Sequence, residues 1–186
     1  FAMEGERVAC GSAHADNVAP CILGGIVLIR SYDPLEIISL PVPNQLYVVV
    51  VHPHVEVLTR VARAVLPKEI SLKTGITQWA NTAAFVAGLY QSDYALISRA
   101  VEDHVAEPAR ADLIPHFYTV QEAALLKGAL ACSISGSGPS VFALTKGSKQ
   151  AAIVAAEMKK VFRQNKTKCD VFVSAVNKKG VRILPS

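Results

Sequence analysis

The order of apolar and amphipathic segments predicts an α+β fold built on one four-stranded sheet. From residue 46 onward the chain reads strand, several helices, strand, strand, helix, strand. That is the element order of a split βαβ, ferredoxin-like sandwich with helices inserted into its first crossover. Two observations carry the prediction. A continuous apolar run of strand length stands at 46–51, a further strand pattern stands at 129–134, and helical periodicity dominates the sequence between them.

The first part of the chain is set apart by proline-bearing breaks. Residues 25–31 form an apolar run that predicts a strand, and the Asp-Pro pair at 33–34 and the Pro-Val-Pro string at 41–43 interrupt regular structure after it. We therefore expect a domain boundary after residue 43. Residues 1–43 would be the tail of one domain, and residues 44–186 would form a second.

Within the second domain, helical periodicity gives way to strand patterns beyond Gly128, a residue type that commonly ends helices. Helices are predicted at 56–65, 74–90, 93–101, 115–127 and 149–163. Further strands are predicted at 140–144 and 170–175, with 181–184 as an additional candidate.

The composition is that of a chain able to bury a core, with 51% hydrophobic residues. No apolar run approaches the roughly twenty residues of a membrane span, and the start of the chain has no basic-then-apolar signal pattern. We expect a cytoplasmic protein with no membrane partner. The four cysteines, Cys10, Cys21, Cys132 and Cys169, show no close paired spacing, which favours buried free thiols over a zinc site or a disulfide framework.

The net charge of +4 is modest, and much of the positive excess lies late in the chain. The basic group at 159–168 falls at the end of a helical pattern, where cations complement the helix dipole. No aromatic stacking platform accompanies it, so a solvated face is favoured over a nucleic-acid surface. We expect no nucleic-acid partner.

The string CSISGSGPS at 132–140 places Gly136 and Gly138 on either side of Ser137, between two apolar runs. Glycine adopts positive φ at little cost and lets successive backbone N–H groups converge on an anion, as in phosphate-binding loops. A tight turn that merely joins two buried strands is the alternative reading of the same string.

A second cluster of polar side chains, His14, Asp16 and Asn17, precedes an apolar stretch. Asp16 can accept from an ammonium group, Asn17 can donate and accept, and His14 can do either according to its tautomer, so together they suit a small zwitterion. Helix capping by Asp16 or Asn17 is the alternative.

Two arginines in helical context are the remaining candidates, Arg63 in TRVARAVLP and Arg110 in EPAR. A guanidinium group binds carboxylate or phosphate through two parallel hydrogen bonds. An exposed charge on a helix is the alternative for each of them.

Four strings taken together resemble those of the homoserine kinases, members of the GHMP family of small-molecule kinases. They are GSAHADNVAPCILGG at 11–25, TRVARAVLP at 59–67, EPARADLIP at 107–115 and SISGSGPSVFAL at 133–144. The glycine string recurs in GHMP kinases that act on mevalonate or galactose, whereas HADN with EPAR narrows the substrate. The resemblance implies a GHMP kinase C-terminal domain preceded by the tail of the N-terminal domain.

This resemblance implies transfer of the ATP γ-phosphoryl group to the hydroxyl of L-homoserine, a step toward threonine. Phosphoryl transfer depends mainly on positioning and charge neutralisation. Asn17 would orient the hydroxyl, His14 and Asp16 would hold the amino-acid head, and Asp16 is the candidate if a general base exists. Arg63 and Arg110 would clamp the carboxylate.

Gly136, Ser137 and Gly138 would close on the phosphate side of the site. The family's upstream loop, PxxxGLGSSAA, does not occur here, so we expect a C-terminal portion that is inactive in isolation. The remaining contacts to ATP, and the Mg²⁺ ligands, would lie mainly upstream, and we assign no metal ligand in this chain. The sequence leaves the oligomeric state undecided, with a homodimer as one possibility.

Two other classes of function are compatible with a ferredoxin-like sheet. In an amino-acid-sensing regulatory module, the arginines and the HADN cluster would bind an amino acid without chemistry, and fold alone does not separate the two functions. An RNA-binding sheet would require exposed aromatic residues on its central strands, and residues 48–51 and 131–134 offer none.

Overall fold

The computed structural model of the chain describes residues 1–10 and 14–183. Its contacts divide into two compact units, one formed by residues 1–43 with the end of the chain from Val176, the other by Asn44–Ala175. From sequence, the end of the chain was expected in the second domain. It groups with the first because Gly25 N donates to Asn177 O (2.7 Å) and Val181 N to Ile22 O (3.1 Å).

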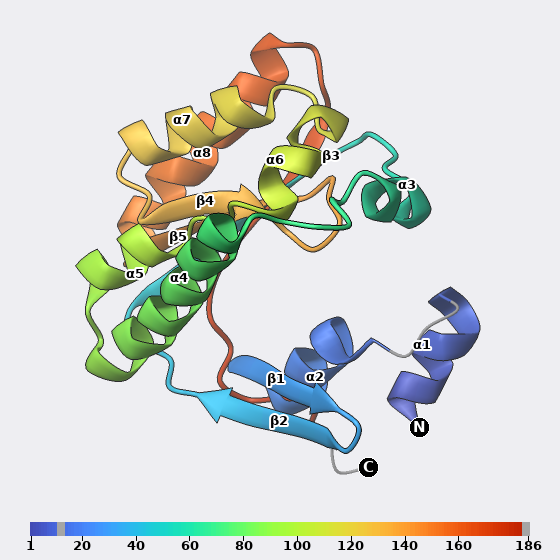
Figure 1. The fold of residues 1–186 in the computed structure, drawn as a ribbon. Coiled ribbons are helices and arrows are strands. Elements are labelled where there is room, and N and C mark those ends of the chain that lie inside the picture. Colours follow the sequence, from blue (N-terminus) through green and yellow to red (C-terminus); the bar gives the residue numbers. More distant parts are fainter. Residues whose placement is uncertain (11–13, 184–186) are drawn as a thin grey trace. The chain divides into compact units, whose positions relative to one another are not determined.

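The first unit holds two helices and an antiparallel hairpin (Figure 1). Its elements are α1 (Ala2–Cys10), α2 (Ala15–Leu23), β1 (Ile26–Tyr32) and β2 (Leu35–Leu40). Strand β2 was not predicted. The Asp33-Pro34 pair is the two-residue turn of the hairpin rather than the end of regular structure, and Tyr32 pairs with Leu35 across it.

The second unit is built on a four-stranded antiparallel sheet in the order β4-β5-β3-β6. Its strands are β3 (Leu46–Pro53), β4 (Ala131–Ile134), β5 (Val141–Lys146) and β6 (Cys169–Ala175). Counted along the chain this order is second, third, first, fourth, as in a split βαβ sandwich. The predicted α+β fold is therefore confirmed. The described residues of the additional candidate strand, 181–183, are not in a strand.

The helices of the second unit fall where periodicity predicts them, apart from one short addition. They are α3 (Thr59–Ala64), α4 (Leu72–Gln91), α5 (Tyr94–Ala100), α6 (Ala106–Arg110), the 3₁₀ turn η1 (Ala111–Leu113), α7 (Phe117–Leu126) and α8 (Ser148–Gln164). The short helix α6 carries Arg110 and was not predicted, since five residues are too few for a periodic pattern.

Helices α7 and α8 cover one face of the sheet, and α4 and α5 lie on its other side (Figure 1). Phe117, Met158 and Phe162 reach into the core between α7, α8 and the sheet, each with at most 2% of its surface exposed. Burial of such a side chain contributes about 1.5–3 kcal/mol. In the part of the chain that the structure describes, no helix has both the length and the apolarity needed to cross a bilayer.

Three cysteine side chains are described, and all three are free thiols. Cys132 is buried and Cys169 is half-buried, but Cys21 is exposed on α2, so the expectation that all would be buried is wrong at Cys21. The side chain of Cys10 lies outside the described residues.

Candidate functional site

The HADN cluster lies at the start of α2. His14 occupies the N-cap position with extended backbone angles, and its side chain makes no capping hydrogen bond. Asp16 and Asn17 follow within the first turn, exposed, and their side chains make no hydrogen bond to the described residues. The capping alternative therefore fails for both, because the helix begins before them. Residues 11–13 of the same string lie outside the described residues.

The glycine pair after α2 allows the end of the chain to approach the helix. Gly24 has φ 76°, a conformation that side chains rarely adopt, and a Cβ there would lie 2.6 Å from Gly180 N. Together with the buried residues Ala15 and Ala19, this contact fixes α2 within its unit.

In the second unit Arg110 connects three segments of the site. Its Nε donates to Ala62 O of α3 (3.0 Å). Its Nη1 donates to Gly136 O (3.0 Å) in the turn formed by residues 136–138, which we call the glycine turn. The carbonyls in the last turn of a helix lack intrahelical partners, and Arg110 supplies one for Ala62. Arg63, the next residue after Ala62, is exposed on α3. One guanidinium group thus links the helix that carries Arg63 to the glycine turn.

These two bonds restrict how Arg110 could hold a carboxylate. A guanidinium fork can be side-on, using the Nε hydrogen, or end-on, using both Nη nitrogens. Because the single Nε hydrogen points to Ala62 O, the end-on fork is the one that remains. A ligand carboxylate at Arg110 would therefore approach the tip of the side chain rather than its edge.

The bond from Arg110 also orients the glycine turn. In a trans peptide the carbonyl oxygen and the following N–H point in opposite directions, so Arg110, by holding Gly136 O, turns the N–H of Ser137 away from itself. The N–H groups of Gly136 and Ser137 donate to no acceptor among the described residues. These two donors are available to an anion, and their role in binding phosphate stays a prediction.

Both glycines of the turn have positive φ, 59° at Gly136 and 80° at Gly138. A Cβ at Gly138 would also lie 3.0 Å from Ile114 Cδ1, whereas a Cβ at Gly136 would face open space. Backbone conformation requires both glycines, and packing adds to the requirement at Gly138.

Residues that sequence reasoning missed hold the base of the turn. Ser135 N donates to Ser140 O (2.8 Å), and the side chain of Ser140 shares a 2.9 Å hydrogen bond with His52 Nδ1 of β3. His52 lies 88 positions from Ser140 in the chain. No local pattern marks that histidine, and only the pairing of β3 with β5 brings it to the turn.

Helix α6 is anchored by two acidic residues that were given no role from sequence. Asp103 accepts hydrogen bonds from the N–H groups of Val105, Ala106 and Glu107, which caps the helix. Glu107 accepts from Gln121 Nε2 (2.9 Å) and from Ser133 Oγ, which ties α6 to α7 and β4. Arg110 stands one turn further along this clamped helix. In the sequence, Asp103 stands shortly before the EPAR string, and an acidic residue there is the signal from which this cap could have been predicted.

The hydrogen bonds of Glu107, which clamp α6 to α7 and β4, lie near a thiol whose pKa is raised. Burial, with the nearby Glu107 carboxylate as the second cause, raises the pKa of Cys132 from 9.0 to about 12. The thiolate is the reactive form, so Cys132 is a packing residue at neutral pH.

The donors of the second-unit site suit anions and not a metal ion. Across the described ranges, no group of three or more His, Cys, Asp or Glu side chains could hold a metal. The groups that face the glycine turn are N–H donors and a guanidinium, which favour phosphate or carboxylate. They do not fit Mg²⁺, which takes oxygen ligands.

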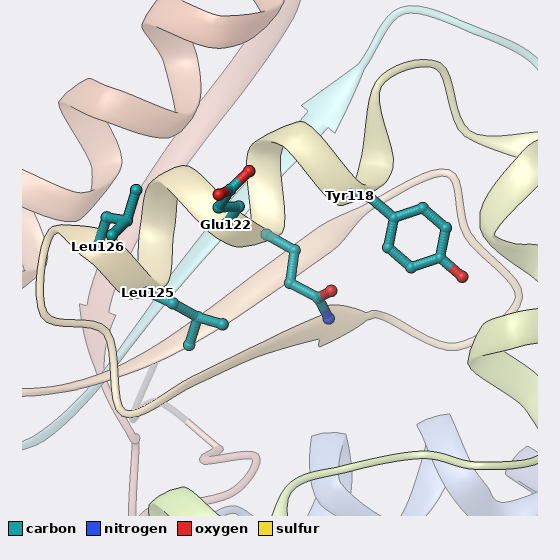
Figure 2. A pocket seen from close by; sticks show the side chains of 5 residues that line it. Tyr118, Glu122, Leu125 and Leu126 are labelled. Carbon is teal, nitrogen blue, oxygen red and sulfur yellow. The ribbon is translucent and has the colours of Figure 1, made fainter.

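A separate hollow of about 530 Å³ on α7 contains none of the predicted site residues. Figure 2 shows Tyr118 and Leu125 at this hollow, on the exposed surface of the helix. The predicted site residues instead form two groups, one per compact unit: Arg63, Arg110 and the glycine turn in the second, and the HADN residues on α2 in the first.

Comparison with known proteins adds sequence and structural relatives. The family model for the GHMP kinases C terminal matches residues 85–164. Homoserine kinases of Chlorobium phaeovibrioides (strain DSM 265 / 1930) and Chlorobium phaeobacteroides (strain BS1) are 55% and 53% identical over 186 residues, which is 99% of this chain and 58% of each of those proteins. The chain thus spans somewhat over half the length of these curated relatives.

A crystal structure of homoserine kinase from Cytophaga hutchinsonii ATCC 33406 matches with a TM-score of 0.95 and 56% identity, covering 97% of this chain and 57% of that one. Identity at this level over nearly the whole chain extends beyond the short strings that first suggested a relationship. The chain belongs to the homoserine kinase family, within the GHMP kinases.

Proposed function

We propose that the protein to which this chain belongs transfers the γ-phosphoryl group of ATP to the hydroxyl of L-homoserine. The observation that carries the proposal is the Arg110 link, which joins α3, with its exposed Arg63, to a glycine turn with two open N–H donors. Cations suited to a carboxylate and N–H groups suited to a phosphate are thereby held in one assembly. L-homoserine supplies the carboxylate and ATP supplies the phosphates.

The roles of the residues follow from their chemistry. Arg63 and Arg110 neutralise the homoserine carboxylate, Arg110 by its end-on fork. The turn at 136–138 stabilises charge on the transferring phosphoryl group through the N–H groups of Gly136 and Ser137. These groups are positioned before substrate arrives, so little reorganisation is needed during the reaction.

The HADN residues are proposed to hold the other end of the amino acid. Asp16 and Asn17 stand exposed in the first turn of α2, with no hydrogen bond inside the described residues, so their polar atoms are available to a ligand. Asp16 and His14 would take the ammonium group, and Asn17 would orient the hydroxyl toward phosphorus. Asp16 is the candidate general base if the reaction uses one. Because the donors around the glycine turn do not fit Mg²⁺, no step is assigned to that ion.

The proposal is tested by measuring ATP-dependent phosphorylation of L-homoserine, with this 186-residue chain and with a protein extended upstream to the length of its relatives. We expect turnover by the extended protein and none by the chain alone, because positioning of both substrates is the main source of catalysis. Binding of L-homoserine without phosphorylation by the extended protein would instead indicate an amino-acid-sensing module. Turnover by the chain alone would contradict the proposal that part of the active site lies upstream of it.

A further inference from the structure

A second basic feature of the chain lies where α8 ends and β6 begins, and none of the predicted site residues contributes to it. A hollow of about 400 Å³ opens there, and its lining includes Lys159, Arg163, Lys166 and Lys168, with His54 from just after the end of β3. These side chains come from three segments of the second unit and surround one space.

The backbone around the hollow is well held. His54 N donates to Lys168 O (2.8 Å), which joins the end of β3 to the segment before β6. Thr167 N donates to Phe162 O (2.9 Å), and Lys166 adopts φ 59°, so the chain turns sharply out of α8. The positions from which the cations project are therefore fixed by the fold.

The four cations are not neutralised by ion pairs within the described residues. Lys159, Arg163, Lys166 and Lys168 form none there. The acid beside them, Asp170, contacts His54 Nε2 through its Oδ2 at 2.9 Å and forms no ion pair with any of the four cations. Like charges gathered around one hollow repel one another, and a bound anion relieves that repulsion.

The last carbonyl groups of α8 do not need these cations as hydrogen-bond donors. The terminal carbonyls of α8 already accept backbone N–H groups: Val161 O from Asn165 N, Phe162 O from Thr167 N, and Arg163 O from Lys166 N. A side-chain amide, Asn165 Nδ2, adds a further bond to Val161 O (2.9 Å). The basic side chains are consequently free to face solvent or a ligand.

The lining selects the chemistry of the ligand. Lysine ammonium groups and an arginine fork are the usual partners of phosphate oxygens, and a volume of this size is at the small end of ligand pockets. No Phe, Tyr or Trp lines the hollow on which a base could stack, and no large apolar side chain could enter a bilayer. A small, multiply charged phosphate fits these conditions better than a nucleic acid or a membrane.

We propose that this hollow, with Lys159, Arg163, Lys166 and Lys168, is a binding site for a small polyphosphate anion, separate from the glycine turn. The inference does not rest on the proposed kinase activity. It requires the cluster of cations and the geometry of the α8–β6 turn, and it holds whether or not the protein phosphorylates homoserine.

The test uses pyrophosphate as the probe, at about 0.15 M NaCl so that exposed charges are screened, with affinity measured by calorimetry and the site located by amide chemical shifts. We expect saturable binding that shifts the amides of Thr167, Lys168 and Cys169. The double variant Lys159→Gln/Arg163→Gln should bind at least about tenfold more weakly, since each residue supplies a charge-assisted hydrogen bond. The matched control Lys149→Gln/Arg99→Gln removes the same charge from exposed positions outside the hollow and should bind as wild type does.

A milder variant, Arg163→Lys, keeps the charge and removes the fork, and it should give an intermediate affinity even if the double variant fails to fold. Three results would overturn the proposal. They are no binding at this salt concentration, equal weakening by the hollow and control variants, and shifts confined to the glycine turn. Tighter binding of a single-stranded oligonucleotide than of pyrophosphate through the same amides would replace the proposed ligand with nucleic acid.

Discussion

Replacing Arg110 with methionine tests whether this side chain builds the site as well as binding substrate. Methionine keeps an unbranched stem and has no donor, so both bonds, to Ala62 O and Gly136 O, are lost. A hydrogen bond from a charged group contributes about 1.5–3 kcal/mol when shielded. The bond to Ala62 O is partly buried, and we take the low end for it. The bond to Gly136 O is exposed, and screening reduces it to about 0.5 kcal/mol.

The expected loss is therefore about 2 kcal/mol in the free energy of unfolding of the second unit, measured by urea denaturation of the chain. Hydrogen exchange gives a local measurement at the N–H of Gly138, which donates to Ser135 O at 3.0 Å. Its protection factor should fall about twofold, because the turn loses the bond from Arg110 to Gly136 O, taken as about 0.5 kcal/mol. Arg99→Met is the matched control, because Arg99 is exposed on α5 and forms no ion pair in the described ranges.

In a protein extended to full length, the change should raise the apparent KM for both homoserine and ATP, since it disturbs the proposed carboxylate clamp and the proposed phosphate turn together. An Arg110→Met chain as stable as the Arg99→Met control, with unchanged exchange at Gly138, would refute the positioning role. A rise in the homoserine KM alone would then leave Arg110 as a simple carboxylate ligand.

Three further predictions concern other parts of the site. Glu107→Gln should weaken the clamp on α6 and raise the homoserine KM of the extended protein severalfold, while Glu122→Gln, an exposed change on α7, should leave KM unaltered. Asn17→Asp should lower kcat substantially without changing the melting temperature, because Asn17 is exposed and the change adds charge near the proposed position of the γ-phosphate; unchanged activity would remove Asn17 from the site. Because the pKa of Cys132 is raised from 9.0 to about 12, its stabilising effect is complete below pH 9 and is lost as pH rises toward 12, by about 2 kcal/mol at about pH 10.5. Cys132→Ala should flatten this alkaline decline in unfolding free energy and Cys21→Ala should not, and parallel curves for all three proteins would contradict the burial argument.

The sequence by itself determined the strands and the longer helices of the second unit, and the family. Strand and helix patterns repeat every two or 3.6 residues, so a local window reveals them, and the strands predicted at 46–51, 129–134 and 170–175 lie close to their observed bounds. The strings around His14, Arg63, Arg110 and Gly136 are also local, and their residue types alone were enough to indicate the homoserine kinases.

Only the tertiary structure decided how the site is assembled, because its bonds join residues distant in the chain. Arg110 reaches Ala62 and Gly136, which are 48 and 26 positions away, and Glu107 reaches Ser133 across 26 positions. Such pairs follow from sheet order and helix packing, which no periodic pattern encodes. The same reason explains the end of the chain: residues from Val176 onward join the first unit through Gly25 and Ile22, a contact between the two ends of the sequence that local composition does not contain.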